Sequence, residues 1–176
     1  MAQMGCFPDR HQRHSIRLLE HDYSQPGAYF VTVCTLNRVE MFGDVVDNEM
    51  VLNGYGRIVG ECWRWLSAQY PYVRLDEWVV MPNHLHGVLI LGETGVQTSS
   101  QPAGKSLGRL VGAFKTISTK RINEARCKVG GLVWQRDFYD HILRGEQDLN
   151  RIREYIAGNP HRWAEDEENP CMWKKD

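Results

Sequence analysis

The chain has 176 residues, of which 42% are hydrophobic and 24% are charged, and its formal net charge is −1. This length and composition are typical of one globular domain with a sizeable core. No apolar run approaches the roughly 18 residues of a membrane span, and the N-terminus lacks the apolar core of a signal peptide. The odd number of scattered cysteines, without a Cys-x-x-Cys pair, excludes a disulfide framework or zinc ribbon and favours a cytoplasmic protein with reduced thiols. They are Cys6, Cys34, Cys62, Cys127 and Cys171.

The N-terminal part begins with a polar, basic stretch, and we expect residues 1–27 to form an arm that precedes the fold. Residues 28–35 are rich in Tyr, Phe, Val and Thr and predict a first strand. A loop through Gly43 follows. Apolar residues at spacings of three and four then predict a helix over residues 51–69.

The middle of the chain predicts a hairpin, a loop and a helix. Residues 75–81 and 84–91 have strand composition, and the Pro82-Asn83 pair between them is typical of a turn. Residues 92–105 contain Gly, Thr, Ser, Gln and Pro with few large apolar side chains, which predicts a flexible loop. Residues 106–127 form a basic amphipathic pattern, so we expect a second helix there.

The C-terminal part completes the pattern of elements. Residues 132–143 have strand character, and a last helix is predicted over residues 146–157, ended by Gly158-Asn159-Pro160. The order β-α-β-β-α-β-α predicts an α+β fold: a ferredoxin-like split β-α-β-β-α-β antiparallel sheet with an added C-terminal helix. We therefore expect a single domain over residues 28–163 and an acidic tail over residues 164–176.

Two histidines, His84 and His86, stand one residue apart at the start of the third predicted strand. Side chains alternate faces along a strand, so both imidazoles point to the same side. Two imidazoles on one rigid strand form half of a metal site. The alternative is a pair of histidines that are hydrogen-bonded near a hairpin and bind no metal.

The last predicted helix offers two groups that could complete a site. Tyr155 and Asn159 are four residues apart and therefore stack on one face. Two imidazoles with an amide oxygen suit Mg²⁺ or Mn²⁺, and no acidic third ligand is obvious from the sequence. A phenol, whose ordinary pKa is about 10, becomes a competent nucleophile when a metal stabilises charge on a phosphoryl group. Metal, tyrosine and basic helix together indicate transesterification of a nucleic-acid phosphodiester through a phosphotyrosine intermediate.

Three segments in this order resemble the single-tyrosine HUH transposases, and most closely their REP-associated tyrosine transposase branch. The segments are residues 79–87 (VVMPNHLHG), 134–141 (WQRDFYDH) and 155–160 (YIAGNP). The resemblance extends over nearly the whole chain, from residues 32–38 to Asn159-Pro160. It implies a ferredoxin-like catalytic domain, with a divalent metal held by His84 and His86.

The resemblance also implies roles for two residues of the last helix. Tyr155 matches the nucleophile that forms a 5′-phosphotyrosine bond to single-stranded DNA. Asn159 matches the third metal-ligand position, where transposon relatives usually carry the longer Gln. The family acts on imperfect DNA hairpins with an adjacent guide sequence, as monomers or as dimers that exchange the tyrosine helix. We therefore expect a transposase-like DNA transesterase that cuts and rejoins single-stranded DNA at repetitive extragenic palindromes in the bacterial nucleoid.

Positive charge gathers between Lys105 and Lys128, where seven Lys or Arg residues accompany one acid, Glu124. The neutral total therefore does not exclude a polyanionic partner, although the basic run could also be a solvated helix face. The resemblance implies that the N-terminal arm helps to read guide bases. The residues predicted to contact DNA are Arg10, Arg13, Arg17, Arg109, Lys115, Lys120, Arg121, Arg136 and Arg144.

Several alternatives remain open from the sequence. Tyr139 is a rival to Tyr155, but we interpret Tyr139 and His141 as sheet residues that pack or contact DNA. A hairpin-binding protein without catalysis is one alternative function. A metal-dependent phosphodiesterase that uses water is another, and it would form no covalent adduct and would tolerate Tyr155→Phe.

Overall fold

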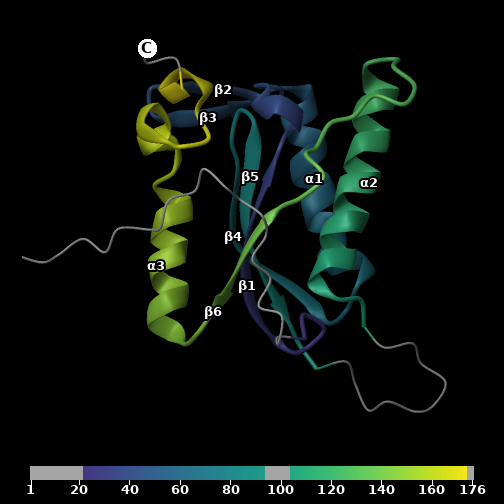
Figure 1. Cartoon of the computed structure of the whole chain (residues 1–176), viewed down its shortest axis with the longest axis vertical. Helices are drawn as coiled ribbons and strands as arrows, with labels where there is room; N and C mark the ends of the chain where they lie inside the picture. The colour runs from purple at the N-terminus through teal and green to yellow at the C-terminus, as the bar shows by residue number, and fades with distance from the viewer. Residues whose placement is uncertain (1–21, 94–103, 174–176) are drawn as a thin grey trace, which may run out of the picture.

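A computed structural model describes residues 22–93 and 104–173. Within these ranges, one antiparallel sheet has the strand order β4-β5-β1-β6. Its strands are β1 (Gly27–Cys34), β4 (Val73–Val80), β5 (His84–Leu91) and β6 (Tyr139–Leu143), and the helices are α1 (Gly54–Gln69), α2 (Leu107–Ala125) and α3 (Glu146–Ala157). This order is that of a ferredoxin-like β-α-β-β-α-β unit with an added helix, so the predicted fold class is confirmed (Figure 1).

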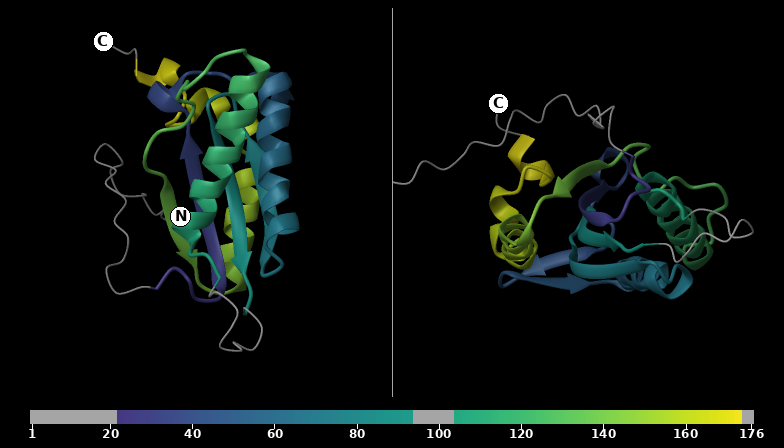
Figure 2. Two further views of the ribbon diagram at one scale, coloured as in Figure 1. Left: turned by 90° about the vertical axis from the view of Figure 1, so that its right-hand side faces the viewer. Right: turned by 90° about the horizontal axis from the view of Figure 1, so that it is seen from below.

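The two faces of the sheet carry different helices. On one face, Leu85 and Leu89 of β5 belong to a large apolar cluster with Trp63 of α1 and Phe114 of α2. On the other face, α3 packs through buried apolar residues in a smaller cluster, made of Phe30, Val88, Leu143, Ile152 and Ile156. Figure 2 shows α3 on one side of the sheet and the α1–α2 pair on the other. Because side chains alternate along β5, His84 and His86 lie on the α3 face.

The region before α1 differs from the prediction. Instead of a loop and a helix from residue 51, it forms a hairpin of β2 (Gly43–Val46) and β3 (Glu49–Leu52). Asp47 and Asn48 connect the strands with φ values of 50° and 64°, a left-handed conformation that Asp and Asn adopt in tight hairpin turns. The helix begins only at Gly54, because the Asn53 side chain accepts hydrogen bonds from the backbone amides of Tyr55 and Gly56 and caps it.

The strand predicted over residues 132–143 is confined to β6. Trp134 makes only an isolated bridge to Thr35, and the following carbonyls do not join the sheet. Instead, the ammonium of Lys115 donates hydrogen bonds to the carbonyls of residues 135, 136 and 137, at 2.9, 3.1 and 2.9 Å. Helix α3 has the predicted bounds, and α2 lies within the predicted residues 106–127.

The segment expected as an acidic tail packs against the domain. It begins within the 3-10 helix η2 (Pro160–Glu165) and contains a second one, η3 (Pro170–Trp173). Asp166 and Glu168 are buried, and Glu168 forms a 2.5 Å ion pair with Arg38. The ordered domain therefore extends to at least residue 173, because two carboxylates of the acidic run find partners inside it.

Parts of two other predicted segments fall outside the described ranges. These are residues 1–21 of the arm, with Arg10, Arg13 and Arg17, and residues 94–103 of the loop. In the part of the chain that the structure covers, no helix has the length and apolar character needed to cross a membrane.

Gly87, directly after the second histidine, packs against Trp63 of α1. A Cβ atom there would lie 2.5 Å from the indole ring of buried Trp63, so we expect Gly87→Ala to lower the free energy of unfolding by about 1–3 kcal/mol. Gly112→Ala is the control, because a Cβ on this exposed α2 glycine meets nothing within 4 Å and should stabilise the helix by about 0.5–1 kcal/mol. Urea denaturation of both variants checks this, and an unchanged Gly87→Ala midpoint would show that the contact can relax.

Candidate active site

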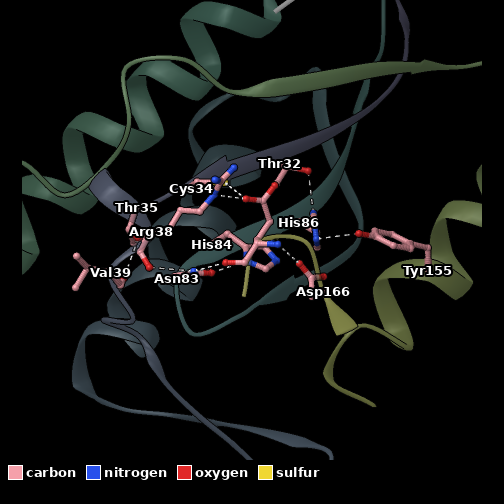
Figure 3. Close-up of polar contacts among 11 residues, drawn as sticks. Thr32, Cys34, Thr35, Arg38, Val39, Asn83, His84, His86, Tyr155 and Asp166 are labelled. Carbon is pink, nitrogen blue, oxygen red and sulfur yellow. Dashed lines mark hydrogen bonds and ion pairs between the residues drawn. The ribbon is translucent and has the colours of Figure 1, made fainter. Parts of the chain in front are cut away.

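The histidine pair lies in the interior at the start of β5. His84 and His86 are 0% and 1% exposed, and their ring centroids are 4.4 Å apart. The register of β1 against β5 places Cys34 opposite His84 and Thr32 opposite His86. Figure 3 shows both rings between β1 and the C-terminal segment. The sheet thus fixes both imidazoles side by side, as the sequence predicts.

Asn83 orients the ring of His84. Its amide nitrogen donates to the carbonyls of Arg38 and Glu168, at 3.1 and 2.7 Å. Carbonyls only accept, so these bonds fix the amide, and its oxygen then lies 2.8 Å from His84 Nδ1. That oxygen also only accepts, so Nδ1 carries the proton and Nε2 carries the lone pair. A histidine held in this way presents Nε2 as a metal ligand.

His86 is held by its neighbours on two sides. Its Nδ1 lies 2.9 Å from the hydroxyl of Thr32, and its ring stacks on Phe30 with centroids 5.4 Å apart. Its other nitrogen, Nε2, lies 3.4 Å from the phenol oxygen of Tyr155 (Figure 3). Both histidines therefore have Nδ1 engaged with a fixed partner and Nε2 directed toward the same region.

Tyr155 reaches the histidines because α3 packs on this face of the sheet. Ile152 and Ile156 are buried against it, which leaves the half-buried Tyr155 at the edge of the apolar contact. The phenol ring meets Phe30 edge-on, with centroids 6.0 Å apart and an interplanar angle of 89°. The structure thus brings Tyr155 and the histidine pair together.

A buried carboxylate that the sequence reasoning missed also joins the cluster. Potential ligand atoms of His84, His86 and Asp166 all lie within 4.8 Å of one another. Asp166 accepts hydrogen bonds from the amide of Asn159 at 3.0 Å and from the backbone of Glu168 at 2.7 Å. The acidic run containing Asp166 resembles a solvated tail, but the tryptophan at position 163 was a sequence signal against that interpretation.

The donor set fits a divalent cation. Two imidazole nitrogens and one carboxylate are a combination that binds first-row metals and Mn²⁺ or Mg²⁺ with water. Asn159, 1% exposed, donates its amide nitrogen to Asp166, while its Oδ1 has no hydrogen-bond partner within residues 22–93 and 104–173. A buried amide oxygen in this position is unfavourable unless it acquires a ligand. Through its bond to Asp166, Asn159 is thus adjacent to the cluster of His84, His86 and Asp166.

Comparison with known proteins finds similar sequences and a similar fold. No protein-family model matches the sequence. A Haemophilus influenzae protein of uncharacterized function is 36% identical over 171 residues, which span 89% of this chain and 93% of the relative. A second H. influenzae protein, provisionally named a REP-associated tyrosine transposase, is 22% identical over 148 residues, 79% of this chain and 73% of that protein.

A solved structure has the same fold. It is a REP-associated tyrosine transposase bound to a REP hairpin, and it matches with a TM-score of 0.53 and 19% identity over 96% of this chain and 92% of that chain. The chain is thus similar in sequence to a protein named as a REP-associated tyrosine transposase and shares its fold with a solved one.

An ion pair ties α3, the helix that carries Tyr155, to the sheet. Arg153 of α3 donates through Nε and Nη2 to the two carboxylate oxygens of Asp76 in β4, at 2.7 and 2.8 Å. The pairing of β4 with β5 shifts by one residue between Leu75 and Trp78, so Asp76 lies in a β-bulge. Bulges redirect side chains, and this one directs a carboxylate toward α3. The pair lies two residues from Tyr155 and anchors its helix.

The hydrogen bonds from Arg153 hold the pKa of Asp76 below its usual range. The folded pKa is below the unfolded value, so the pair stabilises the fold above the ordinary Asp pKa, and this contribution is lost as pH falls through the lowered pKa. We expect Asp76→Asn to lower the Tm by about 2–4 °C at pH 7, with the two Tm values converging toward pH 2. Thermal melts between pH 7 and 2 check this. Asp44→Asn, on exposed β2, is the control, and an equal Tm loss there would contradict the assignment.

The basic residues predicted on α2 lie on the face opposite Tyr155. Lys115 directs its ammonium to three backbone carbonyls, Arg121 pairs with Glu61, and Lys120 lies 4.0 Å from Glu124. Burial lowers the pKa of Lys115 to about 8. Arg109, Arg136 and Arg144 are exposed. Contact of these residues with DNA remains a prediction, and it requires a strand that reaches both faces of the sheet.

Tyr139 is on the Tyr155 face but farther from the histidines. Tyr139 of β6 pairs with Thr32 of β1, and its ring meets Phe30 with centroids 6.2 Å apart. His141, two residues on, lies 3.4 Å from the carboxylate of Asp148. Both are therefore sheet residues, and Tyr155 is the tyrosine in contact with His86.

Proposed function

We propose that the protein is a metal-dependent DNA transesterase that cuts and rejoins single-stranded DNA at hairpin-forming repetitive palindromes through a 5′-phosphotyrosine at Tyr155. One observation carries this proposal: the Tyr155 oxygen lies 3.4 Å from His86 Nε2, beside a buried cluster of two imidazoles and a carboxylate. The REP hairpin bound to the solved relative supports a DNA hairpin as the substrate. Such a substrate places the protein with the chromosome, in the bacterial cytoplasm.

His84, His86 and Asp166 would hold Mg²⁺ or Mn²⁺, with Asn159 as helper through its Oδ1. Such a cation supplies Lewis acidity, which neutralises charge on a phosphodiester. Asn83 and Thr32 engage the Nδ1 atoms of the two histidines, which leaves both Nε2 atoms directed into the site. The rigid sheet keeps this arrangement before DNA arrives, which lowers the reorganisation that catalysis requires.

Tyr155 attacks the scissile phosphorus in this scheme. A bond forms between its phenol oxygen and phosphorus, and the bond from phosphorus to the 3′ oxygen breaks. The phenol proton passes to solvent, and the leaving 3′ oxygen takes up a proton and becomes a hydroxyl. That hydroxyl, or another one, reverses the reaction and rejoins the strand. Tyr155 reaches His86 of its own chain, so one copy contains both parts of the site, and the protein would act as a monomer or as a homodimer.

The test uses end-labelled hairpin oligonucleotides that carry the host's repetitive palindrome, with Mn²⁺ or EDTA, on denaturing gels. We expect cleavage only with the metal, and a protein adduct on the fragment that carries the 5′ phosphate. A hairpin with a scrambled stem is the control and should give neither product. Cleavage without an adduct would favour a phosphodiesterase that uses water. Binding without cleavage, with either Mg²⁺ or Mn²⁺, would favour a non-catalytic hairpin-binding protein.

A further inference from the structure

Arg162 lies directly against the side chain of Tyr155. It belongs to η2, which follows α3, and its guanidinium carbon is 5.4 Å from the centroid of the phenol ring. Its Nη2 donates to the backbone carbonyl of Tyr155 at 3.3 Å. Gly158 makes room for this group, because a Cβ there would lie 3.3 Å from Nη2. The chain thus holds one guanidinium at a defined place beside the tyrosine.

Arg162 differs from the nearby arginines, because each of those forms an ion pair with a carboxylate. Arg153 is tied to Asp76, Arg151 to Asp148 and Arg38 to Glu168. Arg162 is exposed and forms no ion pair with any carboxylate in residues 22–93 or 104–173. A guanidinium has five N–H donors in a planar fork, and the bond to Tyr155 uses one. The other donors belong to an exposed side chain that lies beside Tyr155.

From this placement we infer that Arg162 binds the scissile phosphodiester, with the proposed function as premise. Its remaining N–H groups would donate to a non-bridging phosphate oxygen while the phenol oxygen bonds to phosphorus and the 3′ oxygen leaves. Guanidinium and phosphate match in charge and in geometry, which is why arginine recognises phosphate through paired hydrogen bonds. The group would stabilise the charge that develops in the transition state, next to the nucleophile.

A purely structural role makes a different prediction. The C-terminal carbonyls of a helix lack partners within the helix, and a cation there satisfies one and opposes the helix dipole. If Arg162 did only this, its loss would lower stability and leave the charge dependence of DNA binding unchanged. A contact to phosphate instead releases counterions, so its loss reduces the salt dependence of binding.

The binding test uses the Tyr155→Phe protein in EDTA, so that neither chemistry nor metal contributes. The affinity for a single-stranded hairpin oligonucleotide is measured between 50 and about 300 mM salt. Adding Arg162→Gln should reduce the slope of log K against log salt by about 0.7, the value for one phosphate of a single strand. Arg57→Gln is the control, since Arg57 is exposed on the opposite face and also donates to one backbone carbonyl. An unchanged slope in the Arg162 variant, or an equal change in the Arg57 variant, overturns the inference.

The catalytic test uses the intact tyrosine and measures adduct formation in a single turnover with Mn²⁺. We expect Arg162→Gln to slow it about a hundredfold, as the loss of one transition-state donor does. Arg162→Lys should recover the salt slope but not the full rate, because an ammonium lacks the planar fork. An adduct rate unchanged by Arg162→Gln would overturn this inference alone, whereas adducts that persist in Tyr155→Phe would overturn the proposed function.

Discussion

Replacement of Tyr155 by phenylalanine is expected to remove covalent protein–DNA adducts and strand cleavage while hairpin binding persists. The change deletes only the phenol oxygen, the atom 3.4 Å from His86 Nε2, and leaves the ring that meets Phe30. Loss of a nucleophile costs at least about 10⁴-fold in rate when no other group can replace it. Denaturing gels with labelled hairpin DNA and Mn²⁺ measure both adduct and cleavage, and a mobility shift in EDTA measures binding.

Tyr139→Phe is the matched control for this experiment. Tyr139 lies on the same face of the sheet and also contacts Phe30, but it belongs to β6 and pairs with Thr32. We expect its adduct rate to remain within about threefold of the natural protein and both variants to keep their Tm within about 2 °C. Adducts that persist in Tyr155→Phe and disappear in Tyr139→Phe would reverse the assignment of the two tyrosines.

Local patterns were sufficient to place much of this site. Alternation along β5 put His84 and His86 on one face. Helical spacing predicted Tyr155 and Asn159 near each other, although Asn159 lies beyond Ala157, the last residue of α3. Both elements have the predicted bounds, because turn or terminator residues flank periodic apolar runs. The order of elements then indicated the ferredoxin-like topology, which brings β5 and α3 together.

The features that the sequence did not reveal depend on contacts between distant segments. Asp166 lies about 80 residues from the histidines, in an acidic run whose composition resembles a solvated tail. It is buried because Glu168 pairs with Arg38 and accepts through its backbone from Asn83, which fastens the segment to the β5 turn. The sequence of residues 160–173 has no helical or strand periodicity that would predict the burial of this segment. The β2–β3 hairpin was missed for a different reason: its Asp-Asn turn lay in the segment predicted as a loop, and the end of β3 overlapped the start of the helix predicted from residue 51.

The basic helix illustrates a limit of charge patterns. The run from Lys105 to Lys128 predicted contacts to phosphate, and α2 indeed carries its positive side chains partly exposed. Composition does not specify which face of a sheet a helix covers, and α2 lies opposite Tyr155. One of its cations, on Lys115, instead holds the backbone that leads to β6. Arg162, which stands beside the tyrosine, belongs to no basic run.

The identity of the third metal ligand gives the second large expected effect. We expect His84→Ala and His86→Ala to reduce the affinity for Mn²⁺ to below detection, because each removes one of the few ligands that a cation of this size requires. Asp166→Asn should reduce the affinity by more than about a hundredfold, because it removes the negative charge of the cluster while keeping the size of the side chain. Titration calorimetry measures these affinities without DNA and without turnover.

The Asn159→Ala variant distinguishes the two candidates for the third metal ligand, Asp166 and Asn159. The amide nitrogen of Asn159 donates to Asp166 and so positions the carboxylate. If this is its only role, Asn159→Ala should reduce the Mn²⁺ affinity by about 10- to 100-fold, less than Asp166→Asn does. Glu167→Gln is the control, because it removes one exposed charge next to Asp166 and should change the affinity less than about threefold. If Asn159→Ala instead abolishes binding while Asp166→Asn leaves it intact, the amide oxygen is the ligand and the carboxylate only holds the amide in place.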